Sequence, residues 1–214
     1  MKISVKMAIF TLAMGAFQFG VAVLGWGGFA AFFSHPPRVA VAIVTVVLTF
    51  VALFRAGEQE DRGNRWVLIA FGVPTILIAF LPAYTDRKDL FTFNGDAIRW
   101  LGVVLFAAGG ALRLWPVFVL GPRFSGLVAI QPGHTLVTNG VCGVVRNPSY
   151  LEMLVSALVW ALAFRSKAGV LLVALLIPPL VVRMRAEEKL LLTHFGSGYD
   201  AYCTRTPRLI PRVY

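Results

Sequence analysis

The side chains best suited to bind a polar ligand lie in three clusters near the C-terminus of this chain. The first cluster, residues 130–150, reads IQPGHTLVTNGVCGVVRNPSY. Its glycines let backbone approach a ligand closely, but neither GxxxxGKS/T nor GxGxxG is present, so it is not a phosphate loop. Arg146 and Pro148 stand just before a long apolar run. A charge is expensive inside a membrane, so we expect this stretch to lie at the membrane edge.

The other two clusters supply acidic and aromatic side chains. Residues 183–191 read RMRAEEKLL and place Arg183 four residues before Glu187, on one face of a helix. Such a pair at a solvated helix end would contribute little. Residues 195–214 read FGSGYDAYCTRTPRLIPRVY, and their tyrosines are also typical of an interfacial aromatic anchor. Taken singly, none of the three clusters is specific for one chemistry.

Several kinds of chemistry are not supported by the pattern. The histidines are scattered without metal-ligand spacing, so we predict no metal: His35, His134 and His194. Cys142 and Cys203 form no CxxC pair and are interpreted as free thiols. Ser149 has no histidine partner in sight for nucleophilic catalysis.

Composition indicates where these clusters must be held. The chain has 214 residues, of which 58% are hydrophobic and 14% charged, whereas soluble domains carry about 25% charged residues. The sequence therefore predicts an integral membrane protein in contact with membrane lipids. A net charge of +10 indicates anionic headgroups as partners rather than nucleic acid.

The expected fold is all-α, a polytopic helical bundle of about six spans. A span needs about 20 mostly apolar residues, and the last two candidates are separated by RSK alone, which predicts a tight helical hairpin. The segments are Met7–Phe33, Val39–Phe54, Trp66–Tyr84, Ala97–Leu120, Tyr150–Phe164 and Ala168–Val182.

Lys and Arg are more numerous in the segments that would be cytoplasmic if the chain begins inside. This bias predicts both termini, residues 121–149 and the C-terminal tail on the cytoplasmic side. We expect residues 1–120 to form N-terminal transmembrane helices.

In order and spacing, the three clusters resemble the isoprenylcysteine carboxyl methyltransferase family and its relatives, the membrane phospholipid N-methyltransferases. The family shows GHxLVxxGxY, RHPxY, a helical hairpin, RxxxEExxL and FGxxYxxYxxxxxRxxP. The corresponding segments here begin at Gly133, Arg146, Arg183 and Phe195, and they cover about two-fifths of the chain. Asn147 replaces the usual His, and Cys142 replaces the usual Tyr, which leaves the substrate open.

The resemblance implies an S-adenosylmethionine-dependent methyltransferase that releases S-adenosylhomocysteine and acts on a lipophilic acceptor. It also implies that residues 121–214 form the catalytic region with a cytoplasmic cofactor pocket, in a prokaryotic inner membrane. Cofactor contacts carried over from the family fall on Gln131, His134, Leu136, Val137, Gly140, Arg146, Asn147, Pro148, Tyr150, Glu187 and Glu188. The residues expected to carry the chemistry are Arg146, Tyr150, Arg183, Glu187 and Glu188. Which of the two glutamates touches the cofactor stays open, and His134 could instead cap backbone.

Methyl transfer from a sulfonium needs alignment and a dry site rather than a metal or a covalent intermediate. An anionic acceptor needs no base, which favours carboxyl O-methylation of an isoprenylcysteine-like substrate. The alternatives are N-methylation of phosphatidylethanolamine and S-methylation of a thiol. A non-catalytic membrane protein and an NADPH-dependent relative of sterol reductases are the rivals from other classes, although such reductases use more spans.

Overall fold

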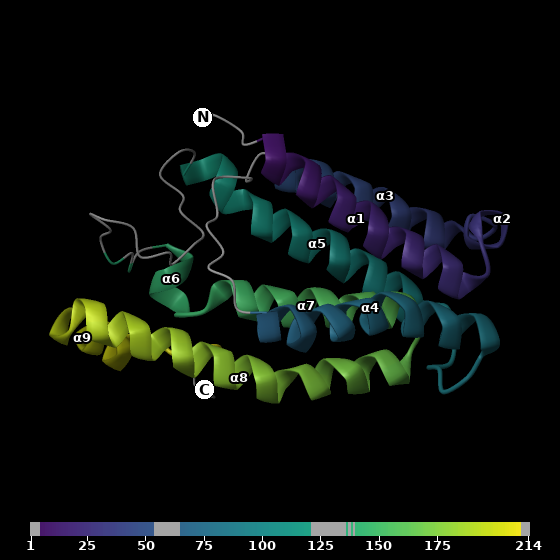
Figure 1. Cartoon of the computed structure of the whole chain (residues 1–214). Coiled ribbons are helices and arrows are strands. Elements are labelled where there is room, and N and C mark those ends of the chain that lie inside the picture. Colours follow the sequence, from purple (N-terminus) through teal and green to yellow (C-terminus); the bar gives the residue numbers. More distant parts are fainter. Residues whose placement is uncertain (1–4, 54–64, 121–135, 137, 139, 211–214) are drawn as a thin grey trace. The chain divides into compact units, whose positions relative to one another are not determined.

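The computed structural model is all-α (Figure 1) and describes residues 5–53, 65–120, 136, 138 and 140–210. The side chains of further helix residues, among them 51–53, 65–71 and 111–120, also lie outside the described set. The described residues form nine helices: α1 (Val5–Trp26), α2 (Phe29–Phe32), α3 (Pro36–Leu53), α4 (Arg65–Lys88), α5 (Ala97–Leu120), α6 (Val141–Val144), α7 (Pro148–Ala163), α8 (Lys167–Phe195) and α9 (Ser197–Arg205).

Each predicted apolar segment forms a long helix, except that the first segment is divided into two helices. Met7–Phe33 was expected as one span, but α1 ends at Trp26 and the short α2 follows. Gly27 and Gly28 both have positive φ, 102° and 106°, which side chains rarely allow. The Gly28 N–H donates to Val23 O at 2.9 Å and the Gly27 N–H donates to Leu24 O at 3.0 Å. This is a Schellman-type ending that closes the helix.

Helix α8 is long and apolar enough to cross a membrane by length and composition. It continues through Pro178 and Pro179, which lie inside it. Shorter apolar stretches were found, within the described residues, at Leu12–Trp26, Pro36–Phe50, Ala97–Gly110 and Tyr150–Ala163. The number of spans therefore stays a prediction, while the all-α character is confirmed.

The chain divides into two compact units, the first made of residues 1–124 and 156–175 and the second of 125–155 and 176–214. In the first unit, α1 packs against α3 and α4, and α3 packs against α5. The predicted functional division at residue 120 stays a prediction, and the turn between α7 and α8 belongs to the first unit.

This turn is held by side-chain and backbone hydrogen bonds from several segments. The hydroxyl of Ser166 accepts a bond from the Gly169 N–H at 2.9 Å, so Ser166 caps the start of α8. The same hydroxyl lies 2.8 Å from that of Thr85 at the end of α4. The loop after α4 adds backbone bonds from Phe93 N to Arg165 O and from Lys167 N to Phe91 O. The predicted tight turn is confirmed, and it is fixed to the loop that follows α4.

Gly102 marks a close approach to the backbone of another helix in the first unit, and a substitution can test it. A Cβ at Gly102 would lie 2.3 Å from the backbone nitrogen of Ala163 and 2.7 Å from the carbonyl carbon of Leu162. Backbone atoms cannot swing aside, so Gly102→Ala is expected to lower the free energy of unfolding by about 1–3 kcal/mol. Unfolding of the detergent-solubilised protein, followed by circular dichroism, measures the change.

Gly109→Ala on the same helix is the matched control, because no described atom lies within 4 Å of a Cβ there. This control should be neutral or slightly stabilising, since alanine is the better helix former. Equal unfolding curves for the two variants would contradict the close approach at Gly102.

Candidate functional site

The two glutamates of the second cluster face different surroundings near the end of α8. Successive helical residues are about 100° apart around the axis, so their side chains diverge. The Glu188 side chain is 9% exposed, and that of Glu187 is 43% exposed. The structure therefore separates two residues that the sequence left equivalent.

Glu188 is the centre of a network of hydrogen bonds and ion pairs in the second unit. Its Oε1 accepts a bond from Asn147 Nδ2 at 3.1 Å and lies 3.6 Å from Arg146 Nη1. Its Oε2 accepts a bond from Arg208 Nε at 2.8 Å. Two guanidinium groups on one carboxylate leave this group of residues with a net positive charge. Charge-assisted bonds of this kind are among the stronger ones in proteins.

Asn147 occupies the position before the first residue of α7, where a polar side chain commonly caps the helix. Pro148 suits the first helical position because its missing N–H would have no partner there. The Asn147 carbonyl accepts the bond from Leu151 N at 3.3 Å. Its side-chain amide instead donates to Glu188 and, at 3.1 Å, to the carbonyl of Arg208. The amide thus links three segments rather than capping its own helix.

The segment after α9 is joined to the same place through the backbone. Arg146 N donates to Pro207 O at 2.9 Å, and Asn147 N donates to Arg208 O at 3.2 Å. This pairing positions the Arg208 side chain beside Glu188. Arg208 was noted in the sequence as part of the FGxxY-to-Pro motif but was not assigned to the site.

Glu187 forms a second group with Tyr150 and Arg183. Its Oε1 accepts a bond from the Tyr150 hydroxyl at 2.5 Å and from Arg183 Nε at 2.9 Å. The Arg183 guanidinium also lies 5.8 Å from the Tyr150 ring centre. The predicted pairing of Arg183 with Glu187 on one helix face is confirmed, and Tyr150 at the start of α7 joins it.

Aromatic side chains of α9 form the apolar side of the site. Tyr199 and Tyr202 are buried and pack with Leu191, against which Leu136 and Cys203 also lie. The Tyr202 hydroxyl donates to Cys142 O at 2.6 Å. The tyrosines, predicted to be an interfacial anchor, are therefore packed inside the second unit.

Burial also makes three acidic groups of this site harder to ionise. It raises the pKa of Tyr202 to about 12 and raises the pKa of Tyr199, with the Glu188 carboxylate as the next cause. Burial raises the pKa of the Cys142 thiol as well. Desolvation disfavours the charged form of each acid, so these phenols and this thiol stay neutral near pH 7.

A pocket of about 440 Å³ opens beside Glu188, within the range of about 300–1,000 Å³ common for small-molecule sites. Four basic and two acidic side chains reach it, so its lining carries a net positive charge. The lining residues are Arg146, Arg185, Glu188, Lys189, Leu192, Tyr199, Asp200, Cys203 and Arg208.

Arg146 carries a donor that the described residues leave unsatisfied. Its Nη1 contacts the Cys203 sulfur and Glu188, but its Nε is buried without a hydrogen-bond partner among the described residues. A buried donor without a partner is costly unless an acceptor meets it. A carboxylate is such an acceptor, and the Glu188 carboxylate suits an ammonium group. The lining of the pocket therefore suits a ligand that carries both groups, as the methionine end of the implied cofactor does.

The predicted site residues are mostly brought together. Arg146, Asn147, Pro148, Tyr150, Arg183, Glu187 and Glu188 all lie in the second unit. Gly140 has φ 64° and lies exposed in a turn, and its predicted cofactor contact stays a prediction. Gln131, His134 and Val137 lie outside the described residues. Within the described residues, no group of three or more His, Cys, Asp or Glu side chains could hold a metal ion.

Sequence reasoning missed Cys203, Arg185 and Lys189 as pocket residues. Arg185 and Lys189 are four residues apart on α8, and Lys189 directly follows Glu188. A helical projection of residues 183–191 would have found them on neighbouring faces. Cys203 offered no signal of its own.

Asn147→Asp tests the hydrogen-bond network around Glu188, in which the Asn147 amide is the uncharged side-chain donor. The change removes both amide bonds and places a second carboxylate against Glu188, so we expect the free energy of unfolding to fall by about 1.5–3 kcal/mol. The exposed Asn94→Asp makes the same chemical change outside this network and should leave stability within about 0.5 kcal/mol. Thermal unfolding of both variants decides, and equal stability would refute the network.

Comparison with known proteins gives a consistent result. The family model of the isoprenylcysteine carboxyl methyltransferase family matches residues 100–193. The chain is 32% identical over 162 residues to Protein-S-isoprenylcysteine O-methyltransferase of Schizosaccharomyces pombe, covering 69% of this chain and 67% of that protein.

Two other relatives carry different names. The chain is 30% identical over 120 residues to Methanethiol S-methyltransferase 2 of Bradyrhizobium diazoefficiens, covering 55% of this chain and 45% of that protein. It is 35% identical over 98 residues to Delta(14)-sterol reductase of Mus musculus, covering 44% of this chain and 23% of that protein.

Proposed function

The chain belongs to the isoprenylcysteine carboxyl methyltransferase family, whose members are membrane-embedded and use S-adenosylmethionine, and we propose that it methylates a lipophilic acceptor. The observation that carries the proposal is the basic pocket beside Glu188, built by segments that match the family motifs. We further propose carboxyl O-methylation of an isoprenylcysteine-like substrate as the reaction. The catalytic region is proposed to be residues 121–214, facing the cytoplasm.

In this proposal, two charged groups hold the cofactor by its amino-acid end. Glu188 receives the ammonium group, and Arg146 donates through its otherwise unpaired Nε to the carboxylate. Arg208 and Asn147 keep the Glu188 carboxylate in place and act as positioning residues. S-adenosylmethionine would supply an electrophilic methyl group carried on a sulfonium.

The acceptor follows from how the carboxylates are engaged. Both oxygens of Glu188 accept bonds from nitrogen donors, and Glu187 Oε1 accepts bonds from Tyr150 and Arg183. In this proposal Glu188 serves the cofactor and Glu187 orients Tyr150 and Arg183, so neither carboxylate is assigned to take a proton from an amine. An acceptor that arrives as an anion needs no base, which favours a carboxylate over phosphatidylethanolamine.

The second group of residues is proposed to serve this acceptor. Arg183 presents a guanidinium beside the Tyr150 ring, and a guanidinium can hold a carboxylate through paired bonds. Glu187 orients both side chains. The thiol S-methyltransferase among the relatives makes a thiol the second candidate acceptor.

Glu188→Gln and Glu187→Gln separate the two glutamates. We expect Glu188→Gln to weaken binding of S-adenosylhomocysteine at least tenfold, about 1.4 kcal/mol, because a neutral amide no longer attracts the ammonium group. Glu187→Gln should keep that affinity within about twofold. Calorimetry with each variant in detergent measures both, with NADPH as a parallel titrant because of the sterol reductase similarity.

Wild-type affinity in Glu188→Gln would refute the role of Glu188. If the folded protein bound NADPH and not S-adenosylhomocysteine, the methyltransferase proposal itself would fail.

A panel of acceptors tests the substrate class. Purified protein in nanodiscs with methyl-labelled cofactor should transfer label to a prenylated cysteine bearing a free carboxylate, and not to the same compound as its methyl ester. A long-chain thiol is the second arm and phosphatidylethanolamine the third. Label in phosphatidylethanolamine alone would overturn the proposal of an anionic acceptor.

A further inference from the structure

A second pocket, of about 420 Å³, lies in the first unit and is lined by the ends of its helices. Its basic lining residues come from α3, α4, α5 and the turn between α7 and α8: Arg38, Arg87, Arg99 and Arg165. The acidic residues of the lining are Asp86 and Asp96, so positive charge is in excess. Nothing in the proposed methyl transfer uses this pocket.

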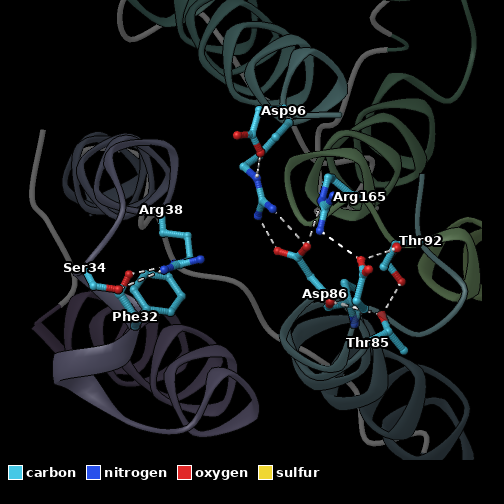
Figure 2. Close-up of polar contacts among 12 residues, drawn as sticks. Phe32, Ser34, Arg38, Thr85, Asp86, Thr92, Asp96 and Arg165 are labelled. Atoms are coloured by element: carbon cyan, nitrogen blue, oxygen red, sulfur yellow. Dashed lines mark hydrogen bonds and ion pairs between the residues drawn. The ribbon is translucent and has the colours of Figure 1, made fainter. Parts of the chain in front are cut away.

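Asp86 neutralises part of that charge (Figure 2). Its side chain is fully buried. Its carboxylate accepts hydrogen bonds from Nη1 and Nη2 of the Arg99 guanidinium. Arg165 Nε donates to Asp86 Oδ1 at 3.0 Å. Arg99 also contacts Asp96 at 3.3 Å. Two of the four arginines therefore already have carboxylate partners.

Arg38 is buried at 3% exposure, yet its hydrogen bonds go to neutral groups. Its Nε donates to Phe32 O at 2.8 Å, and its Nη2 donates to Ala31 O and Ser34 Oγ, both at 3.1 Å. Figure 2 shows this cluster around Arg38, Ser34 and Phe32. The guanidinium carbon stacks 3.9 Å from the centre of the Trp26 ring. Among the described residues, no carboxylate forms an ion pair with Arg38.

Arg87, near the end of α4, lies against Gly27, the residue that follows Trp26. Its guanidinium carbon is 2.5 Å from the place where a Cβ of Gly27 would stand, so the missing side chain of Gly27 provides the space for this cation. Arg87 is exposed and forms no ion pair within the part of the chain that the structure describes. Arg38 and Arg87 thus both lie against the Trp26–Gly27 segment. Neither forms an ion pair among the described residues, while Asp86 and Asp96 of the same pocket act on Arg38 at longer range.

We propose that this pocket binds a phosphate group through Arg38 and Arg87. The four arginines of its lining outnumber the two carboxylates, and a bound anion would offset this excess of positive charge. Guanidinium groups match phosphate oxygens in geometry and charge. The shared ligand chemistry is a phosphate, supplied either by the headgroup of an anionic phospholipid or by free inorganic phosphate.

The surroundings favour the lipid as the source. Trp26 and Trp100 both line the pocket, and Trp100 is 43% exposed. Indole rings are enriched at the headgroup level of membranes, and the family is membrane-embedded. Exposed Phe29 and Phe33 lie on the chain between Trp26 and Arg38. Apolar side chains next to a cationic pocket are suited to a molecule with a phosphate and acyl chains.

The experiment compares Arg87→Gln with Lys88→Gln. Both side chains are exposed cations on consecutive residues, but Arg87 lines the pocket and Lys88 is absent from its described lining. Detergent-solubilised protein is titrated separately with phosphatidylglycerol, phosphatidylcholine and inorganic phosphate. The readouts are retained lipid by native mass spectrometry and the shift in unfolding temperature.

We expect wild-type protein and Lys88→Gln to prefer phosphatidylglycerol over phosphatidylcholine, and Arg87→Gln to bind phosphatidylglycerol at least tenfold more weakly. A shift produced by inorganic phosphate that depends on Arg87 would support the phosphate site with free phosphate as its source. Equal losses in the two variants, or no preference for phosphatidylglycerol in the wild type, would overturn the proposal. Binding of S-adenosylhomocysteine by both variants, at wild-type affinity, shows that they are folded.

Discussion

The second unit depends on one buried carboxylate, that of Glu188. It joins α8 to the residues before α7 through Arg146 and Asn147, and to the segment after α9 through Arg208. Removing one partner of a buried ion pair generally costs about 3–5 kcal/mol, because the other charge is left buried and unpaired. The residues that line the pocket therefore also hold its walls together.

The use of the same residues for binding and for structure is consistent with the small number of specialised catalytic groups in the sequence. Methyl transfer from a sulfonium requires placement more than proton transfer, and the structure provides placement through hydrogen-bonded charges. Glu188 lies in the pocket wall, while Glu187 is engaged by Tyr150 and Arg183. The adjacent glutamates thus have different partners, which is what the proposed division between a cofactor side and an acceptor side needs.

The first unit uses the same device at Asp86, where two arginines meet one buried carboxylate. In that pocket the arginines outnumber the carboxylates, because Arg38 and Arg87 also lie against the turn after α1. That turn exists because Gly27 and Gly28 end the helix with positive φ. The backbone conformation at Gly27 therefore leaves the space for the Arg87 guanidinium. The excess of positive charge makes the pocket a candidate site for an external anion.

The sequence by itself determined the local features of this protein. Apolar runs predicted the helices, and α5 begins and ends at the predicted residues, Ala97 and Leu120. The ordered motifs predicted the family and most residues around Glu188. These signals depend on neighbours a few positions apart along one helix.

Only the tertiary structure decided which charges pair. Asn147 forms a hydrogen bond with Glu188, 41 positions away in the sequence, and Arg165 forms one with Asp86, 79 positions away. At such separations the residue types alone do not identify the partner. The choice between Glu187 and Glu188 and the place of Arg208 in the pocket wall were open for the same reason. Such contacts depend on the packing of distant segments, and a single sequence carries no record of that packing.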